Sequence, residues 1–109
     1  MSQEIGNVIA GLYEPYNYEA ITVADSAIGF TASILKDNSA PLKDCQRVIC
    51  TLETASVRYT TDGTTPTTTI GHLLNAGDIV IVQGQPAISN FRAIRTGGTS
   101  GSLKCTFER

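Results

Sequence analysis

The sequence has no tryptophan, one methionine, one histidine and three cysteines among its 109 residues. The cysteines form no C-x-x-C pair and the histidine lies far from them along the chain, so we expect no zinc site. No serine lies in a G-x-S-x-G motif that would present it to a histidine base. The sequence therefore predicts no catalytic residue, no bound metal and no cofactor.

Long apolar runs and an excess of basic charge are also missing. The longest apolar runs are a few residues, far too short to span a membrane. The formal net charge of −2 does not favour binding to nucleic acid. The N-terminus lacks the basic start of a signal peptide, and the number of cysteines is odd, so we expect reduced thiols and synthesis in a cytosol.

The first 17 residues, MSQEIGNVIAGLYEPYN, are predicted to form an arm in front of a folded domain of residues 18–109. Neither a strand nor a helix period persists in the arm, yet its apolar side chains suit a docked segment rather than a free tail. We expect it to dock on a neighbouring subunit; the alternative is an extra edge strand on its own sheet. The residues expected to contact a partner are Ile5, Val8, Ile9, Leu12, Tyr13 and Tyr16.

Seven short segments with strand character follow, separated by turns rich in glycine, proline and aspartate. The segments are residues 20–24, 28–35, 45–53, 56–60, 78–83, 91–95 and 102–108. This spacing predicts an all-β fold, an antiparallel β-sandwich of seven to eight strands that is immunoglobulin-like or jelly-roll-like. We expect no helix longer than a turn.

Alternation of apolar and polar residues predicts which side chains face the core. The predicted core residues of the third and last segments are Val48, Cys50, Leu52, Leu103, Cys105 and Phe107. In the second segment, Phe30, Ala32 and Ile34 share one face. Residues 79–82 are continuously apolar, which indicates either burial on both faces or an interface.

The best-defined turn lies in VRYTTDGTTPT, residues 57–67. The carboxylate of Asp62 can accept from a backbone N–H two residues on, and Gly63 allows a positive φ. Pro66 removes a backbone donor and fixes φ, so a central strand cannot continue there. We predict that Asp62, Gly63 and Pro66 form a structural turn.

Other polar residues allow both a functional and a structural interpretation. His72 is a possible catalytic base, but without an oriented partner we favour a loop or edge histidine. Asp78 lacks the clustered oxygen ligands of a calcium loop and is expected to open a strand. Arg58, Arg92 and Arg95 are possible basic contacts for nucleic acid, and the acidic composition favours a partner-facing salt-bridge surface instead.

The blocks VRYTTDGTTPT, GHLLNAGD and FRAIRTGGTSGSLKCTFER, in this order, resemble a family of small tailed-bacteriophage virion proteins. The resemblance extends from about Ala20 to the C-terminus and does not include residues 1–17. Cys105 and Phe107 stand where endings of this family often have valine and tyrosine. The piece Y-T-T-D-G-T-T-P-T, residues 59–67, is also similar to the immunoglobulin-like C-terminal module of chitobiase-type proteins, a sandwich without catalysis of its own.

The resemblance implies a structural role as a capsid decoration or cement protein on the outside of the phage head. The protein would be made in the cytoplasm of the host bacterium and become part of the virion. The implied partners are the major capsid protein and neighbouring copies in a dimer or trimer, with no membrane and no direct nucleic acid. The alternative is a carbohydrate- or host-surface-binding module of a head or tail fibre, which would expose aromatic side chains.

Overall fold

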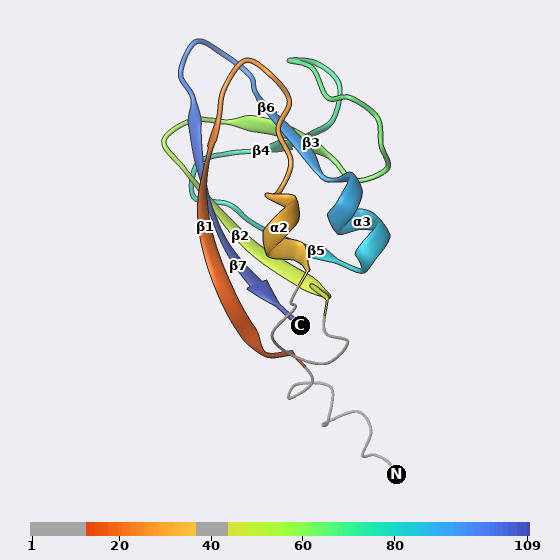
Figure 1. Ribbon diagram of the computed structural model, residues 1–109. Coiled ribbons are helices and arrows are strands. Elements are labelled where there is room, and N and C mark those ends of the chain that lie inside the picture. The colour runs from red at the N-terminus through yellow and green to blue at the C-terminus, as the bar shows by residue number, and fades with distance from the viewer. Residues whose placement is uncertain (1–12, 37–43) are drawn as a thin grey trace.

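The computed structural model describes residues 13–36 and 44–109, which form a β-sandwich-like fold of two antiparallel sheets and two short helices (Figure 1). The strands are β1 (Pro15–Val23), β2 (Arg47–Glu53), β3 (Val57–Thr60), β4 (His72–Leu74), β5 (Ile79–Gln83), β6 (Arg92–Arg95) and β7 (Gly101–Glu108). The helices are α2 (Ala32–Leu35) and α3 (Gln85–Asn90). The all-β sandwich predicted from strand spacing is confirmed.

The larger sheet has the strand order β1-β7-β2-β5, and each neighbouring pair is antiparallel. Across β2 and β7, Val48 pairs with Phe107, Cys50 with Cys105, and Leu52 with Leu103. All six side chains are at most 1% exposed, which confirms the predicted core faces of both strands. Burying a side chain of this size contributes roughly 1.5–3 kcal/mol, so this seam is a main source of stability.

The smaller sheet has the order β4-β3-β6 and is joined to the larger sheet by aromatic rings. The rings of Phe30 and Phe91 stack with their centroids 4.4 Å apart, and Phe107 of β7 meets Phe30 edge-on at 5.6 Å. Phe91 directly precedes β6, so the cluster spans both sheets. Aromatic pairs of this geometry stabilise by about 0.5–1.5 kcal/mol beyond the area they bury.

The predicted strand over residues 28–35 is wrong for most of its length. Ile28 makes an isolated bridge to β6 through two backbone hydrogen bonds of 2.9 Å, and the chain then turns into α2. Glu19 of β1 accepts hydrogen bonds from both the backbone N–H and the hydroxyl of Thr31, the residue before the helix. This contact ends the extended segment, and Ile34 packs against the core from the helix.

Besides α2, two further elements were not predicted, β4 and α3. Strand β4 pairs with β3 in the smaller sheet. Helix α3 begins after Gly84, whose φ is 95°, and carries Pro86 in its first turn. Proline is favoured there because the first helical N–H groups have no partner within the helix. With six residues, α3 exceeds the single turn that we expected.

Strand β1 begins at Pro15, inside the segment expected to be an arm. The neighbouring Glu14 already joins the larger sheet, because its backbone N–H donates to Arg109 at 2.9 Å and its carbonyl accepts from Arg109 at 3.0 Å. Residues 14–17 therefore contact the chain's own sandwich. Four of the residues expected in the arm lie outside the described residues: Ile5, Val8, Ile9 and Leu12.

Candidate interaction surface

The four edge strands of the two sheets differ in how they are protected against further pairing. The edge β1 contains Pro15 and an irregular register, and β4 has three residues. The edge of β6 is covered, since Ile28 bridges to it and Arg95 donates to the Ala24 carbonyl at 3.0 Å. Strand β5 has no proline, charged residue or register shift. An edge of this kind is an open template for another strand.

The hydrogen bonds to β2 determine which backbone groups of β5 point outward. The N–H of Gly84 donates to the Gln46 carbonyl, and the N–H of Leu52 donates to the Asp78 carbonyl, both at 3.0 Å. Antiparallel pairing alternates, so the even-numbered residues of β5 bond to β2. The backbone groups that point away from β2, without a partner among the described residues, are those of Ile79, Ile81 and Gln83.

Apolar side chains continue from this edge across the outer face of the larger sheet. Ile79 and Ile81 are 64% and 52% exposed, while Val82 is buried, so the expectation of burial on both faces is wrong. Ile49 of β2 is paired with Ile81, and Tyr18 of β1, 58% exposed, lies in the same row beyond Thr106 of β7. The apolar stripe, as we call it, consists of Ile49, Ile79, Ile81 and Tyr18.

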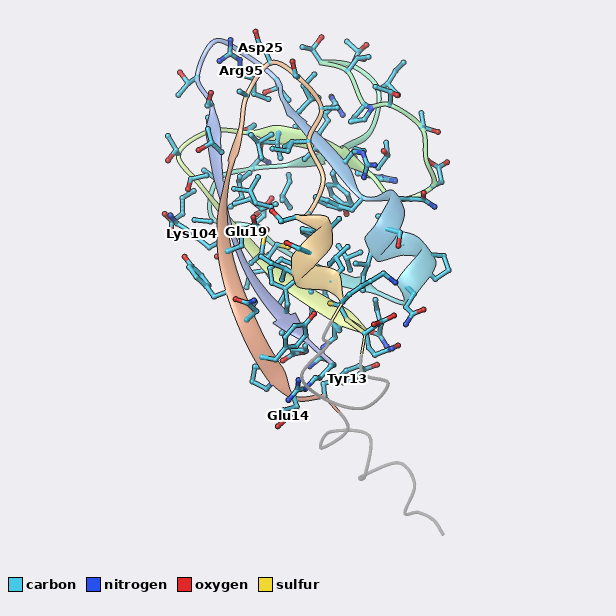
Figure 2. The ribbon with its side chains drawn as sticks, in the orientation of Figure 1. Tyr13, Glu14, Glu19, Asp25, Arg95 and Lys104 are labelled. Atoms are coloured by element: carbon cyan, nitrogen blue, oxygen red, sulfur yellow. The ribbon has the colours of Figure 1, made fainter. Side chains whose placement is uncertain are left out.

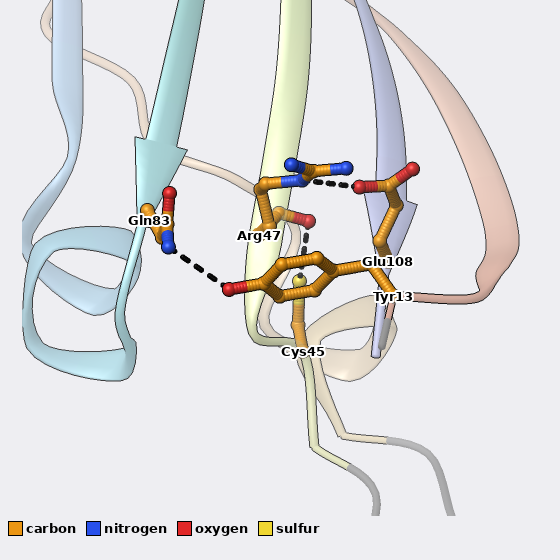
Figure 3. A network of polar contacts seen from close by, with 5 residues as sticks. All are labelled: Tyr13, Cys45, Arg47, Gln83 and Glu108. Atoms are coloured by element: carbon orange, nitrogen blue, oxygen red, sulfur yellow. Dashed lines mark hydrogen bonds and ion pairs between the residues drawn. The ribbon is translucent and has the colours of Figure 1, made fainter. Parts of the chain in front are cut away.

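Tyr13 lies across the end of this outer face (Figure 3). The side-chain amide of Gln83 donates to its hydroxyl at 2.9 Å, and the guanidinium of Arg47 lies 4.2 Å from its ring centroid. Arg47 in turn donates through Nε to Oε1 of Glu108 at 2.5 Å, in a pair whose side chains are 27% and 10% exposed. The contacts of Tyr13 hold the start of the described chain beside the last residue of β5.

Tyr16 fixes the beginning of β1 to α2. Its hydroxyl donates to the carbonyl of Ile34 at 2.7 Å, and the guanidinium of Arg109 lies 5.4 Å from its ring. Burial, with the neighbouring Cys45 thiol, raises the pKa of Tyr16 well above its usual value, and burial also raises the pKa of Cys45. Tyr13 and Tyr16 therefore both contact the chain's own sandwich.

The two ends of the sandwich carry different residues (Figure 2). Asp25 and Arg95 lie at one end, and Tyr13 and Glu14 lie at the other. Between them on the outer face, Lys104 makes an exposed ion pair of 3.9 Å with Glu53 beside the apolar stripe. The described chain thus begins at the end opposite Asp25, where β5 ends.

The predicted turn residues lie together between β3 and β4. The carboxylate of Asp62 accepts from the Thr64 N–H at 3.0 Å, and this hydrogen bond holds the pKa of Asp62 below its usual value. Gly63 has a φ of 93°, the positive value expected from the sequence. Pro66 is almost fully buried, so it packs the loop against the rest of the fold. The hydrogen bond of Asp62, the positive φ of Gly63 and the burial of Pro66 all fit a structural role.

The remaining polar candidates bind the chain's own loops. Arg58 donates at 3.0 Å to two carbonyls of the segment before β4, and Arg92 donates to two carbonyls at the α3–β6 junction. Arg95 donates to the Ser100 hydroxyl at 3.2 Å. His72 is exposed on β4, with its ring 5.4 Å from that of Tyr59. The acceptors of these arginine hydrogen bonds are backbone carbonyls and the Ser100 hydroxyl rather than carboxylates.

A hollow of about 330 Å³ lies beside the outward edge of β5. Tyr59 and His72 of the smaller sheet and Ala87 of α3 line it. From β5, both the inward-facing Val80 and Val82 and the outward-facing Ile81 and Gln83 contribute to its lining, so it lies along the edge of the strand. The hollow follows the strand, which suits an extended segment of chain.

No family model, no curated protein and no solved structure matches this chain. Across residues 13–36 and 44–109, no group of three or more histidine, cysteine and acidic side chains could hold a metal ion. None of the helices in this part of the chain is long and apolar enough to cross a membrane. The candidate interaction surface consists of the outward edge of β5, the adjoining hollow and the apolar stripe.

Proposed function

We propose that the protein is a structural subunit that decorates the outside of a bacteriophage head and stabilises it through subunit contacts. The observation that carries this proposal is the open edge of β5 with its exposed isoleucines. Natural sheets protect their edges because an open apolar edge pairs with other chains. An edge left open in this way is suited to a partner. The resemblance of residues 57–67, 71–78 and 91–109 to virion proteins supports a phage head as the setting.

The composition of the surface also fits a protein partner. Apolar residues lie at its centre, and polar residues such as Gln83 and Lys104 lie around it, the usual arrangement of an interface. Burying an exposed isoleucine contributes roughly 1.5–3 kcal/mol. Association itself costs about 4–15 kcal/mol in lost freedom, so one such patch gives weak binding. Simultaneous contacts to several subunits of a lattice strengthen it.

The test uses phage heads assembled without this protein. Purified full-length chain is mixed with these heads and sedimented, and the bound fraction is measured over a range of concentrations. We expect saturable binding by the wild type and at least a tenfold weaker affinity for Ile81→Lys. Ile70→Lys is the matched control, because Ile70 is 50% exposed, about as much as Ile81, but lies in the loop before β4.

Each outcome of this experiment decides one part of the proposal. If the wild-type chain does not sediment with the heads, the decoration function is wrong. If Ile81→Lys binds as well as the wild type, the decoration function stands but the assigned surface is wrong. If Ile70→Lys loses as much affinity as Ile81→Lys, the effect is general and does not locate the contact on β5.

A further inference from the structure

We propose that the outward edge of β5 binds the N-terminal arm of a second copy of this chain, with residues from 5–12 added as a strand antiparallel to β5. This inference rests on the proposed function, in which it names a second copy as the partner on the β5 edge. The proposed contact joins neighbouring copies by their arms, in addition to any contact with the capsid.

The first reason is the place where the described chain begins. Tyr13 is held to Gln83, the last residue of β5, so in every copy an arm leaves close to an open edge. Twelve residues precede Tyr13, and a fully extended segment of this length spans at most about 40 Å. Strand β5 has five residues and is about 17 Å long. The arm is long enough to reach a neighbouring copy and to pair along its whole β5.

The second reason is strand direction, which disfavours pairing between the arm and the edge of the same copy. Because β1-β7-β2-β5 is antiparallel at every step, β1 runs antiparallel to β5. An arm that reversed before β1 to follow its own β5 would run parallel to it, and parallel pairing is slightly less stable per residue. An arm from another copy can approach in the antiparallel direction.

The third reason is the side of the sheet on which the arm is held. Tyr13 lies on the outer face with Arg47, whereas the hollow extends from the edge of β5 to Tyr59 and His72 of the smaller sheet. The chain's own arm starts beside Gln83, which also lines the hollow, and would have to cross the edge of β5 to reach Tyr59 and His72. A second copy's arm has no such constraint, since its own Tyr13 is held on a different molecule.

The fourth reason is chemical. In an extended strand, successive side chains point to opposite sides, so Val8 and Leu12 would share one side and Ile5 and Ile9 the other. One side can fill the hollow, and the other can cover the isoleucines of the apolar stripe. The backbone of the added strand would bond to the outward N–H and C=O groups of β5. Binding of an extended segment to an open edge is an established recognition mode.

The resulting contact is not symmetric, because one copy gives an arm and the other offers an edge. Contacts of this kind close into a ring, or into a dimer when two copies exchange arms reciprocally, and otherwise extend as a chain. A ring or a reciprocal dimer agrees with the dimer or trimer that the sequence resemblance implies.

The test measures the mass of the full-length chain in solution by sedimentation velocity over a concentration series. We expect the wild type to reach a mass of at least two chains. The edge variant Ile81→Pro removes one outward N–H and leaves the bonds to β2 intact, since proline is tolerated where an edge N–H faces solvent. The arm variant Val8→Lys/Ile9→Lys places charge on both sides of the arm. Both variants should be monomeric, and the control Ile70→Lys should behave as the wild type.

Mixing the two variants separates arm exchange from the other possible contacts. The edge variant keeps an intact arm and the arm variant keeps an intact edge, so the mixture should form a one-to-one complex although each is monomeric alone. Thermal melts check that both variants are folded, and Ile81→Lys replaces Ile81→Pro if the latter is not. The measurement contains no phage heads, so its outcome is independent of the decoration function.

Three results would overturn the inference. If the wild type is monomeric at every concentration, the β5 edge does not bind the arm of a second copy. Its partner is then the chain's own arm or another protein. An arm variant that still associates shows that two edges pair with each other. A mixture of the two variants that stays monomeric shows that the arm of one copy does not bind the edge of another.

Discussion

The hydroxyl of Tyr13 accepts a hydrogen bond of 2.9 Å from the side-chain amide of Gln83, 70 residues away in the sequence (Figure 3). This bond joins the beginning of the described chain to the end of the open edge strand. Arg47 covers the tyrosine ring from β2 and is itself fixed by Glu108. The same side chains therefore fix the position of Tyr13 and surround the end of β5.

Replacing Tyr13 should loosen the arm without unfolding the sandwich. Tyr13→Ala loses the hydrogen bond and the contact with Arg47, which together contribute about 1–2 kcal/mol at a partly exposed site. Tyr13→Phe keeps the ring and should lose about half of this. Urea denaturation of both variants measures the difference. If Tyr13→Ala lowers the free energy of unfolding by several times the expected amount, Tyr13 is part of the core rather than a contact on its surface.

Gly63→Val should destabilise the protein by roughly 1–3 kcal/mol, because a β-branched residue is strained at a φ of 93°. No atom lies within 4 Å of the position that a Cβ would take, so backbone strain is the cause. Gly97→Val is the matched control, since Gly97 has the same open space and no positive φ. Equal melting temperatures for the two variants would refute this explanation.

Glu108→Gln should destabilise the protein by roughly 1–3 kcal/mol, because Arg47 would keep its charge in a partly buried site with a weaker acceptor. The exposed pair of Lys104 and Glu53, at 3.9 Å, provides the control. Glu53→Gln should change the free energy of unfolding by less than about 1 kcal/mol. Chemical denaturation at low and moderate salt measures both, and an equal effect at the two sites would show that burial of the first pair is unimportant.

Asp62 should contribute to the pH dependence of stability in acid. Its pKa is lowered in the folded state, so its contribution is present above its ordinary value of 3.8 and is lost as the pH falls through the folded value. Asp62→Asn should therefore lower the melting temperature at neutral pH and have little effect once the wild-type carboxyl is protonated. Parallel melts from pH 7 down to about pH 2 test this. A difference that stays constant over the whole range would exclude the carboxylate charge as the cause.

Much of the fold could be predicted because its signals are local. Alternation at Val48, Cys50 and Leu52 identified a core face, and the Asp62–Gly63 pair identified a turn. The same alternation predicted a strand over residues 28–35, but a contact with another segment outweighs the local strand pattern there. Glu19 binds Thr31 from β1 and turns the chain into α2, and no pattern within residues 28–35 contains this information.

The candidate surface was only partly predictable. The continuous apolar run over residues 79–82 indicated either burial or an interface, and the choice between them depends on strand order. Ile79 and Ile81 are exposed because they lie on the outer face of the larger sheet, while Val82 of the same strand faces the core. The contact between Tyr13 and Gln83 has no signal in the sequence, since it joins two segments that only the completed sheet brings together.

The central claim is that this protein is a repeated subunit on the outside of a phage head. The most direct test is to count its copies in purified particles by quantitative mass spectrometry, with the major capsid protein as the internal standard. The account predicts copies on the order of hundreds per particle, because a decoration subunit follows the symmetry of the whole head. A dozen copies or fewer, as in a tail ring, or none at all would contradict it.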